Sequence, residues 1–85
     1  MTETSLHRLK RLKMRSMRRG IREMDLILGA YADRALGEMD AAALDLYDAL
    51  LNENDQDLYQ WVTGQAAPPG RYGTLIDGIA QSLGK

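Results

Sequence analysis

Apolar residues recur three or four positions apart along most of this chain, which is the spacing of residues on one side of an α-helix. No stretch alternates apolar and polar residues for long enough to be a strand. Glycine, proline and polar clusters divide the pattern into five segments. Their apolar stripes are Leu6, Leu9, Met14, Met17, Ile21 and Met24; Met24, Ile27 or Leu28, Tyr31 and Ala35; Ala43, Leu44, Tyr47, Leu50 and Leu51; Leu58, Trp61 and Val62; and Tyr72, Leu75, Ile76, Ile79 and Leu83. The sequence therefore predicts an all-α fold, a compact bundle of about five short helices.

Residues that favour helix ends stand between these segments. The expected N-terminal caps are Ser5, Gly20, Asp40 and Asp55, and the expected stops are Gly37 and Gly64. Residues 65–70 include two prolines and are predicted to form a stiff loop, because proline cannot continue a helix. A chain of 85 residues is long enough for one domain and too short to enclose a large catalytic cavity, so we expect a single helical domain over residues 1–85.

The charges are distributed unequally along the chain. Residues 1–22 hold eight Lys or Arg and one acidic residue, a balance of +7, whereas residues 23–85 hold three Lys or Arg and eleven acidic residues, a balance of −8. On a helix, the arginines of the first part form a ridge opposite the apolar stripe; they are Arg8, Arg11, Arg15, Arg18 and Arg22. Such a ridge suits an acidic partner, a phosphate-bearing ligand, or docking onto the acidic remainder of the same chain.

Nucleic-acid binding is the main alternative function that this ridge raises, because each phosphate that an arginine neutralises releases counterions. A small regulator or an antitoxin-like protein would use a basic arm in this way. However, no aromatic residues are interleaved with the arginines, and no helix-turn-helix or other known module accompanies them. We therefore do not expect nucleic acid to be the partner.

Catalytic and metal-binding constellations are missing from the sequence. It has no cysteine, so it offers no thiolate nucleophile, disulfide or Cys-based metal site. His7 is the only histidine and has no sequence-adjacent acid or nucleophile to complete a triad, which favours a surface or interhelix position. The acidic run at 53–57 resembles a calcium loop but lacks the required glycine and the final glutamate. We expect no catalytic residue and no metal site, and hence not an enzyme.

The sequence also bears on location. No apolar run approaches the roughly 20 residues that a membrane span requires, so we expect no membrane insertion. The first residues lack the apolar stretch and cleavage site of a secretory signal. The Arg-rich, acid-poor amino terminus faintly resembles a mitochondrial presequence, but a bacterial cytoplasmic protein is the simpler interpretation.

Residues 19–23 read Arg-Gly-Ile-Arg-Glu, an R-G-x-x-E pattern. Arg19 and Glu23 are four positions apart, a spacing at which opposite charges can pair on a helix. In a purely structural interpretation, Gly20 is a helix cap and Glu23 complements the positive end of the helix dipole. Alone, the five residues do not separate this interpretation from a functional one.

A second segment favours a functional interpretation of the pattern. About thirty residues downstream, Leu50-Leu51 precedes Asp55-Gln56-Asp57-Leu58-Tyr59-Gln60-Trp61-Val62. The two segments, their spacing and the chain length together resemble the SdhE family, the small FAD assembly factors of succinate dehydrogenase and fumarate reductase. The resemblance covers residues 15–62 well. It implies a helical, chaperone-like protein that binds the flavoprotein subunit and promotes covalent attachment of FAD to a histidine of that subunit.

The resemblance also implies which residues meet the partner. The R-G-x-x-E residues are expected at the contact with the flavoprotein, together with their charged neighbours; the set is Arg18, Arg19, Gly20, Arg22, Glu23 and Asp25. Gly20 would let two backbones approach closely. Arg19 would offer its planar fork to carboxylates or carbonyls of the partner, and Glu23 would orient Arg19 or meet a cation.

The same resemblance implies that this chain holds no FAD stably by itself and acts on the FAD of its partner. We expect it to act as a monomer and to position the flavoprotein, without contributing an acid, base or nucleophile. A rival version is direct capture of FAD by Arg11, Arg15 and Arg18, which are expected to be exposed on a convex helix. It is less favoured, because no glycine-rich cradle accompanies these arginines.

Overall fold

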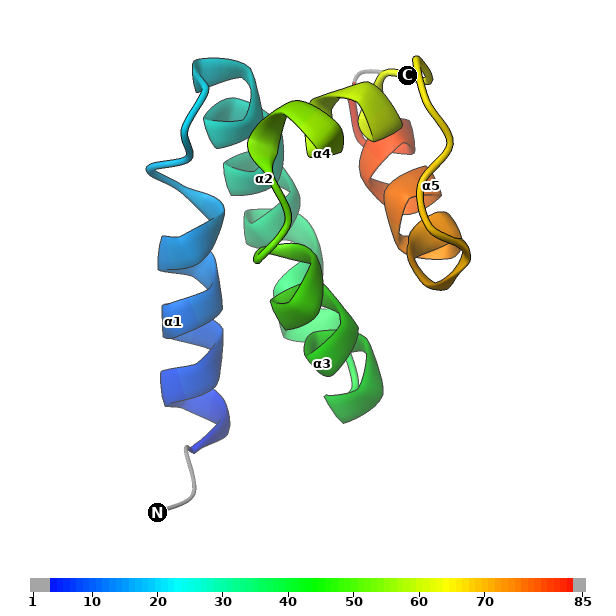
Figure 1. The fold of residues 1–85 in the computed structure, drawn as a ribbon. Helices are drawn as coiled ribbons and strands as arrows, with labels where there is room; N and C mark the ends of the chain where they lie inside the picture. Colours follow the sequence, from blue (N-terminus) through cyan, green and yellow to red (C-terminus); the bar gives the residue numbers. More distant parts are fainter. Residues whose placement is uncertain (1–3, 84–85) are drawn as a thin grey trace.

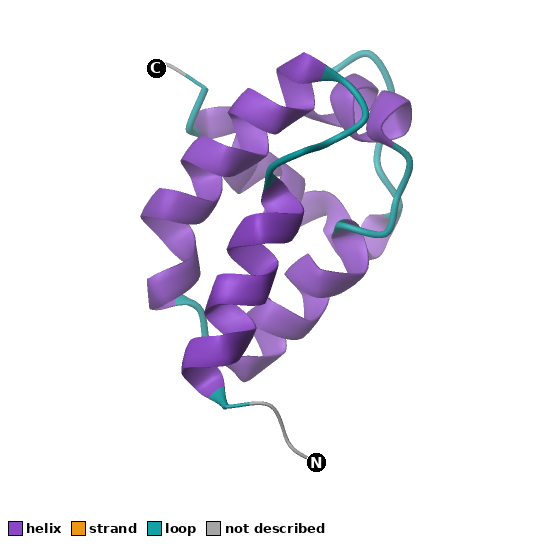
Figure 2. Ribbon diagram, turned by 90° about the vertical axis from the view of Figure 1, so that its left-hand side faces the viewer, coloured by secondary structure: helices purple, strands orange, loops and turns teal. Residues whose placement is uncertain are grey.

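The computed structural model describes residues 4–83, and this part of the chain contains helices and loops but no strand (Figure 2). The α-helices are α1 (Ser5–Ser16), α2 (Arg22–Ala35), α3 (Ala41–Leu50), α4 (Asp55–Val62) and α5 (Gly73–Gln81). Two single 3₁₀ turns, η1 (Leu36–Glu38) and η2 (Gly70–Tyr72), follow α2 and precede α5. The predicted all-α fold with five short helices is confirmed.

Helix α2 is the centre of the arrangement, since it contacts α1, α4 and α5. Helices α1 and α5 lie on opposite sides of the molecule, and α4 crosses near the end where α1 leads into α2 (Figure 1). This crossing brings the start of α4 close to the link between α1 and α2, although the two segments are more than thirty residues apart in sequence.

A single apolar core lies between the helices. Its buried residues are Leu12, Met24, Leu28, Ala32, Leu36, Leu44, Tyr47, Leu50, Leu51, Leu58, Val62, Tyr72, Ile76 and Ile79. The predicted stripes of the last four helices supply most of them. Trp61, predicted to be in the core, is only partly buried and stacks on Tyr72, with ring centroids 6.1 Å apart.

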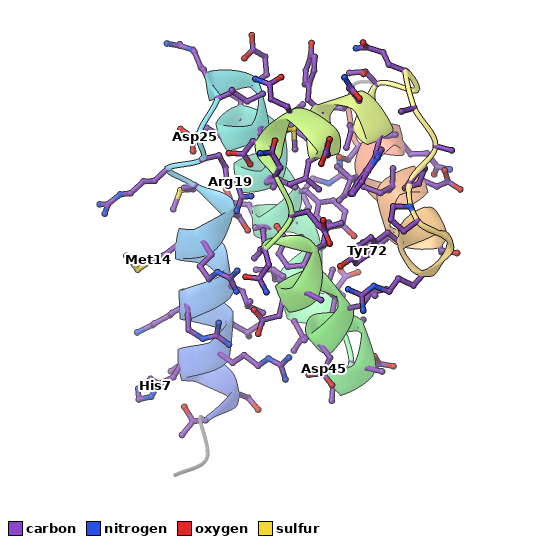
Figure 3. The ribbon with its side chains drawn as sticks, viewed as in Figure 1. His7, Met14, Arg19, Asp25, Asp45 and Tyr72 are labelled. Carbon is purple, nitrogen blue, oxygen red and sulfur yellow. The ribbon has the colours of Figure 1, made fainter. Side chains whose placement is uncertain are left out.

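The predicted apolar stripe of the first segment is only partly confirmed: Leu9, Ile21 and Met24 lie in or against the core, but Leu6, Met14 and Met17 are exposed. Leu6 and Met14 are 61% and 57% exposed, and Met14 points away from the other helices (Figure 3). The residues of α1 that are fully buried are Leu12 and Ser16. Relative to the prediction, the helix is rotated about its axis so that its arginines face α3. There they pair with acidic side chains, and their alkyl stems can lie along apolar surface.

The helix ends show which capping predictions hold. Asp40 caps α3 as predicted, by accepting a hydrogen bond from the N–H of Ala43 (2.8 Å). Gly64 follows α4 in the left-handed region (φ 82°), as expected of a stop. Gly37 lies inside the 3₁₀ turn that extends α2.

Three predicted caps are displaced by one residue. Thr4 caps α1 in place of Ser5, and Asn54 caps α4 in place of Asp55. Ile21, not Gly20, occupies the cap position of α2, and it makes no side-chain capping bond. Asp55 is the first residue of α4, and its carboxylate is turned toward the link between α1 and α2.

Candidate partner-binding corner

The link between α1 and α2 forms a sharp corner, which we define as residues 17–23. Met17 is extended, and Arg18 adopts the left-handed region (φ 57°), which non-glycine residues rarely occupy. Ile21 is extended again before α2 begins. A left-handed residue costs conformational free energy, so contacts from elsewhere in the fold must hold the corner in place.

Arg19 supplies most of those contacts. Its Nε donates to Oδ1 of Asp55 (2.7 Å), and its Nη1 donates to the carbonyl oxygens of Arg15 (3.0 Å) and Leu51 (3.1 Å). Its Nη2 donates to the carbonyl oxygen of Glu53 (3.4 Å). The side chain is only 10% exposed and lies between the corner and the start of α4 (Figure 3).

This arrangement corrects two expectations for Arg19. Its guanidinium does not pair with Glu23, because Asp55 and three backbone carbonyls occupy it. For the same reason, the fork is not presented to a partner. The residue that was expected to reach outward instead ties the corner to the α3–α4 connection.

Gly20 approaches the same carboxylate. Its N–H donates to Oδ2 of Asp55, so the two oxygens of Asp55 serve two consecutive residues of the corner. A Cβ atom on residue 20 would lie 2.8 Å from that oxygen, so a larger residue there would displace the Asp55 carboxylate. Glycine allows this backbone to approach a side chain of the same molecule closely.

The other predicted residues remain at the surface. Arg18, Gly20, Arg22 and Glu23 are exposed. Within residues 4–83, the side chain of Glu23 makes no hydrogen bond or ion pair. Asp25 is partly buried, and its Oδ1 accepts a hydrogen bond from the N–H of Arg19 (3.4 Å). Four of the six residues are thus accessible to a partner, while the side chains of Arg19 and Asp25 make contacts within the protein.

An apolar surface groove adjoins the corner, and the sequence analysis did not find it. The groove has a volume of about 650 Å³ and is lined by Met17, Arg18, Asp25, Leu26, Gly29, Ala30 and Asp33. Leu26 is 63% exposed and Met17 is 40% exposed. The available signal was the position of Leu26, which is two residues from both Met24 and Leu28 and therefore lies off the buried stripe of α2.

The remaining arginines of α1 face α3 and form a second set of contacts, which we call the ladder. Arg8 pairs with Asp45 (2.5 Å), Arg11 with Asp48 (3.1 Å), and Arg15 with both Asp48 and Asn52. The hydrogen bond from Arg11 lowers the pKa of Asp48, and the charges of Arg11 and Arg15 act in the same direction.

The ladder corrects the expectation that Arg11 and Arg15 are exposed. Of the three uses considered for the basic arm, the structure shows docking onto the acidic part of the same chain. Of Arg11, Arg15 and Arg18, which the rival version assigns to FAD capture, Arg18 is the one that is exposed. His7 is exposed at the far end of α1, in agreement with a surface position.

A buried polar pair lies beneath the corner. The hydroxyl oxygens of Ser16 and Tyr47 are 2.5 Å apart, and Ser16 also donates to the carbonyl oxygen of Leu12 (2.8 Å). Burial raises the pKa of Tyr47 to about 12. The tyrosine therefore stays protonated at neutral pH and serves the packing of α1 against α3.

The described residues contain no group of three or more His, Cys, Asp or Glu placed to hold a metal ion. No helix among them is long and apolar enough to cross a membrane.

Comparison with known proteins gives consistent results. The protein family described as flavinator of succinate dehydrogenase matches residues 10–82. The mitochondrial succinate dehydrogenase assembly factor 2-B of Drosophila mojavensis is 41% identical over 71 residues, which cover 81% of this chain and 45% of the relative. The mitochondrial succinate dehydrogenase assembly factor 2 of Candida glabrata is 53% identical over 53 residues, covering 62% of this chain and 35% of the relative.

The corresponding factor of Scheffersomyces stipitis is 46% identical over 61 residues, which cover 72% of this chain and 41% of the relative. The chain therefore spans less than half the length of these curated relatives. The family match includes the corner, the start of α4 and most of the described helices. On this basis the chain belongs to the family of flavinators of succinate dehydrogenase.

Proposed function

We propose that this protein binds the flavoprotein subunit of succinate dehydrogenase or fumarate reductase and promotes the covalent attachment of FAD to it. The observation that carries the proposal is the match of the flavinator family to residues 10–82. The names of the relatives identify them as succinate dehydrogenase assembly factors, which supports the same process.

The proposed contact face combines the exposed part of the corner with the groove beside it. Glu23 is exposed and has no partner within residues 4–83, so its charge is available to a cation of the flavoprotein. Leu26 and Met17 add apolar surface next to that charge. An apolar centre with charged residues at its edge is the usual composition of a protein–protein interface.

The proposed mechanism is positional. In this mechanism, the present protein holds the flavoprotein in a geometry that favours covalent attachment of its FAD to one of its own histidines. Orientation of reacting groups alone can supply large rate factors, so this chain need not donate or accept a proton. The proposal includes no catalytic residue and no stable FAD site in this chain, and it treats the protein as a monomer outside the complex.

The bacterial cytoplasmic location inferred from the sequence is part of the proposal. The named relatives are mitochondrial proteins. Detection of the protein in fractionated cells of its source organism tests this point independently of the assay below.

The test is co-expression of the flavoprotein with this protein, followed by measurement of flavin fluorescence from the denatured flavoprotein band in a gel. We expect wild-type protein to raise covalent flavin and Glu23→Ala to raise it much less. The matched control is Glu38→Ala, since Glu38 is also an exposed glutamate but lies in η1, beyond the far end of α2. Equal covalent flavin with and without the wild-type protein would contradict the proposal.

The structure gives the nucleic-acid alternative no support. That alternative depended on the arginine ridge, and three of its five members are engaged with α3. Titration with duplex DNA at two salt concentrations tests it, because phosphate binding must weaken as salt increases.

A further inference from the structure

The carboxylate of Asp55 accepts two of the hydrogen bonds that fix the corner to the rest of the fold. Its Oδ1 accepts from Nε of Arg19 (2.7 Å), and its Oδ2 accepts from the N–H of Gly20. The side chain is 15% exposed, so water competes little for these bonds. Both bonds connect segments that are about 35 residues apart.

We propose that Asp55 is a positioning residue for partner binding: it acts through Arg19 and Gly20 to hold the corner in the shape that presents Glu23 and the groove to the flavoprotein. This inference rests on the proposed function and adds to it a residue outside the R-G-x-x-E pattern. Asp55 makes no contact with FAD or the flavoprotein in this account.

The position of Asp55 supports a role other than capping. It is the first residue of α4, where aspartate commonly serves the helix end, but Asn54 already caps this helix by accepting from the N–H of Gln56 (2.8 Å). The carboxylate of Asp55 is therefore free to bond across the molecule. Arg19 extends the connection, because it also binds the carbonyl oxygens of Leu51 and Glu53 on either side of the turn before α4.

The backbone of the corner explains why such a restraint is needed. Arg18 has a positive φ, a conformation that the chain leaves readily when nothing holds it. Residues 19 and 20 follow immediately, and Asp55 binds one atom of each. Loss of the carboxylate would let the corner sample other shapes, and the flavoprotein would bind only the fraction that keeps the present one. The apparent affinity falls by that fraction.

The ladder supplies a matched control. Asp48 also accepts from two arginines of α1, but it lies on α3, away from the corner. Asp55→Asn and Asp48→Asn each replace one carboxylate oxygen by an NH₂ group that faces a donor. Asp48→Asn shows the effect of losing an ion-paired carboxylate away from the corner, whereas a positioning role affects only Asp55→Asn.

The experiment measures covalent flavin formation on the purified flavoprotein with added FAD, as a function of the concentration of this protein. We expect Asp55→Asn to need about tenfold more protein for half of the maximal rate, which corresponds to about 1.4 kcal/mol of binding free energy. The maximal rate at saturation should stay within about twofold of wild type, because the bound complex is the same. Asp48→Asn should match wild type in both quantities.

A second readout follows the corner in the protein alone. Amide hydrogen exchange of Gly20 should accelerate by about tenfold in Asp55→Asn and remain unchanged in Asp48→Asn, since only the first variant weakens the bond to that N–H. In Gly20→Ala, the added Cβ atom displaces the Asp55 carboxylate. This variant should raise the half-maximal concentration in the same way as Asp55→Asn. It serves as the second variant if Asp55→Asn does not fold.

The possible failures are distinguishable. No effect of the wild-type protein on covalent flavin would overturn the proposed function itself. A wild-type effect that both Asp55→Asn and Gly20→Ala retain at the same half-maximal concentration would overturn the positioning role. Equal losses in Asp55→Asn and Asp48→Asn would also overturn it, because a purely structural contribution gives that result.

Discussion

Arginine–aspartate pairs occur along α1, at the ladder, and just after its C-terminal end, at the corner, but they differ in their exposure to solvent. At the ladder, three arginines pair with two aspartates of α3 and with Asn52 just after it. Asp45 is 71% exposed and Asp48 is 28% exposed. At the corner, one arginine binds one carboxylate and three backbone carbonyls, and both charged side chains are at most 15% exposed. Exposed pairs are screened and contribute little each, whereas a shielded pair with satisfied hydrogen bonds fixes a backbone shape.

This contrast explains where a binding surface can be built. The ladder joins two regular helices whose backbones are already determined by their own hydrogen bonds. The corner has no such support, and the shielded pair of Arg19 and Asp55 provides it. Exposed residues beside a fixed backbone are presented in one arrangement, which lowers the entropy lost on binding.

The largest expected effect is the loss of Arg19. Arg19→Ala would leave the Asp55 carboxylate and three carbonyl oxygens without their donor, so the free energy of unfolding should fall by about 3 kcal/mol. Arg8→Ala, at the exposed end of the ladder, should reduce it by less than about 1 kcal/mol. Urea unfolding followed by circular dichroism measures both values. Equal losses would contradict the difference between the two ends of α1.

The next effect concerns the groove. Leu26→Ser should weaken binding to the flavoprotein by about tenfold, because a central apolar contact is lost, and should leave the free energy of unfolding within about 0.5 kcal/mol of wild type. Isothermal titration with the purified flavoprotein measures the affinity.

Leu6→Ser is the control for this prediction. Leu6 is exposed to the same degree as Leu26, 61% against 63%, but it lies at the start of α1, far from the corner. Its affinity should equal that of wild type. A comparable loss of affinity in both variants would mean that exposed apolar area in general, and not the groove, determines binding.

The smallest effect is the dependence of stability on pH at the ladder. The pKa of Asp48 is lowered in the folded state, so its contribution is fully present above its unfolded pKa of about 3.9 and is lost as the pH falls through its folded pKa. The difference in unfolding free energy between wild type and Asp48→Asn should therefore be constant near neutral pH and shrink below about pH 4. Urea unfolding at pH 7 and pH 3 measures it. A difference in unfolding free energy that is larger at pH 3 than at pH 7 would contradict this prediction.

Local spacing was sufficient to predict the helices. The apolar periodicity of each segment indicates which residues share one side of a helix. The stop at Gly64 and the cap at Asp40 depend only on neighbouring residues. These features were confirmed because no distant contact is needed to produce them.

The rotation of α1 and the role of Arg19 could not be predicted in this way. Helix α1 carries apolar residues on one side and arginines with long alkyl stems on the other, and the spacing within α1 does not reveal the acidic residues of α3 that pair with those arginines. Likewise, the local pairing of Arg19 with Glu23 is plausible by spacing, but Asp55 provides a shielded carboxylate from 36 residues away. The spacing of residues within one helix does not show that Asp55 replaces Glu23 as the partner of Arg19.

The most direct test of the central claim is to locate the flavoprotein on this protein in solution. Amide signals of the isotopically labelled protein can be followed by NMR during titration with the unlabelled flavoprotein. Our account predicts that the signals of Gly20, Glu23 and Leu26 change or disappear first, while those of Asp45 and Asp48 on the ladder change least. Perturbations centred on the ladder, with the corner unaffected, would contradict it.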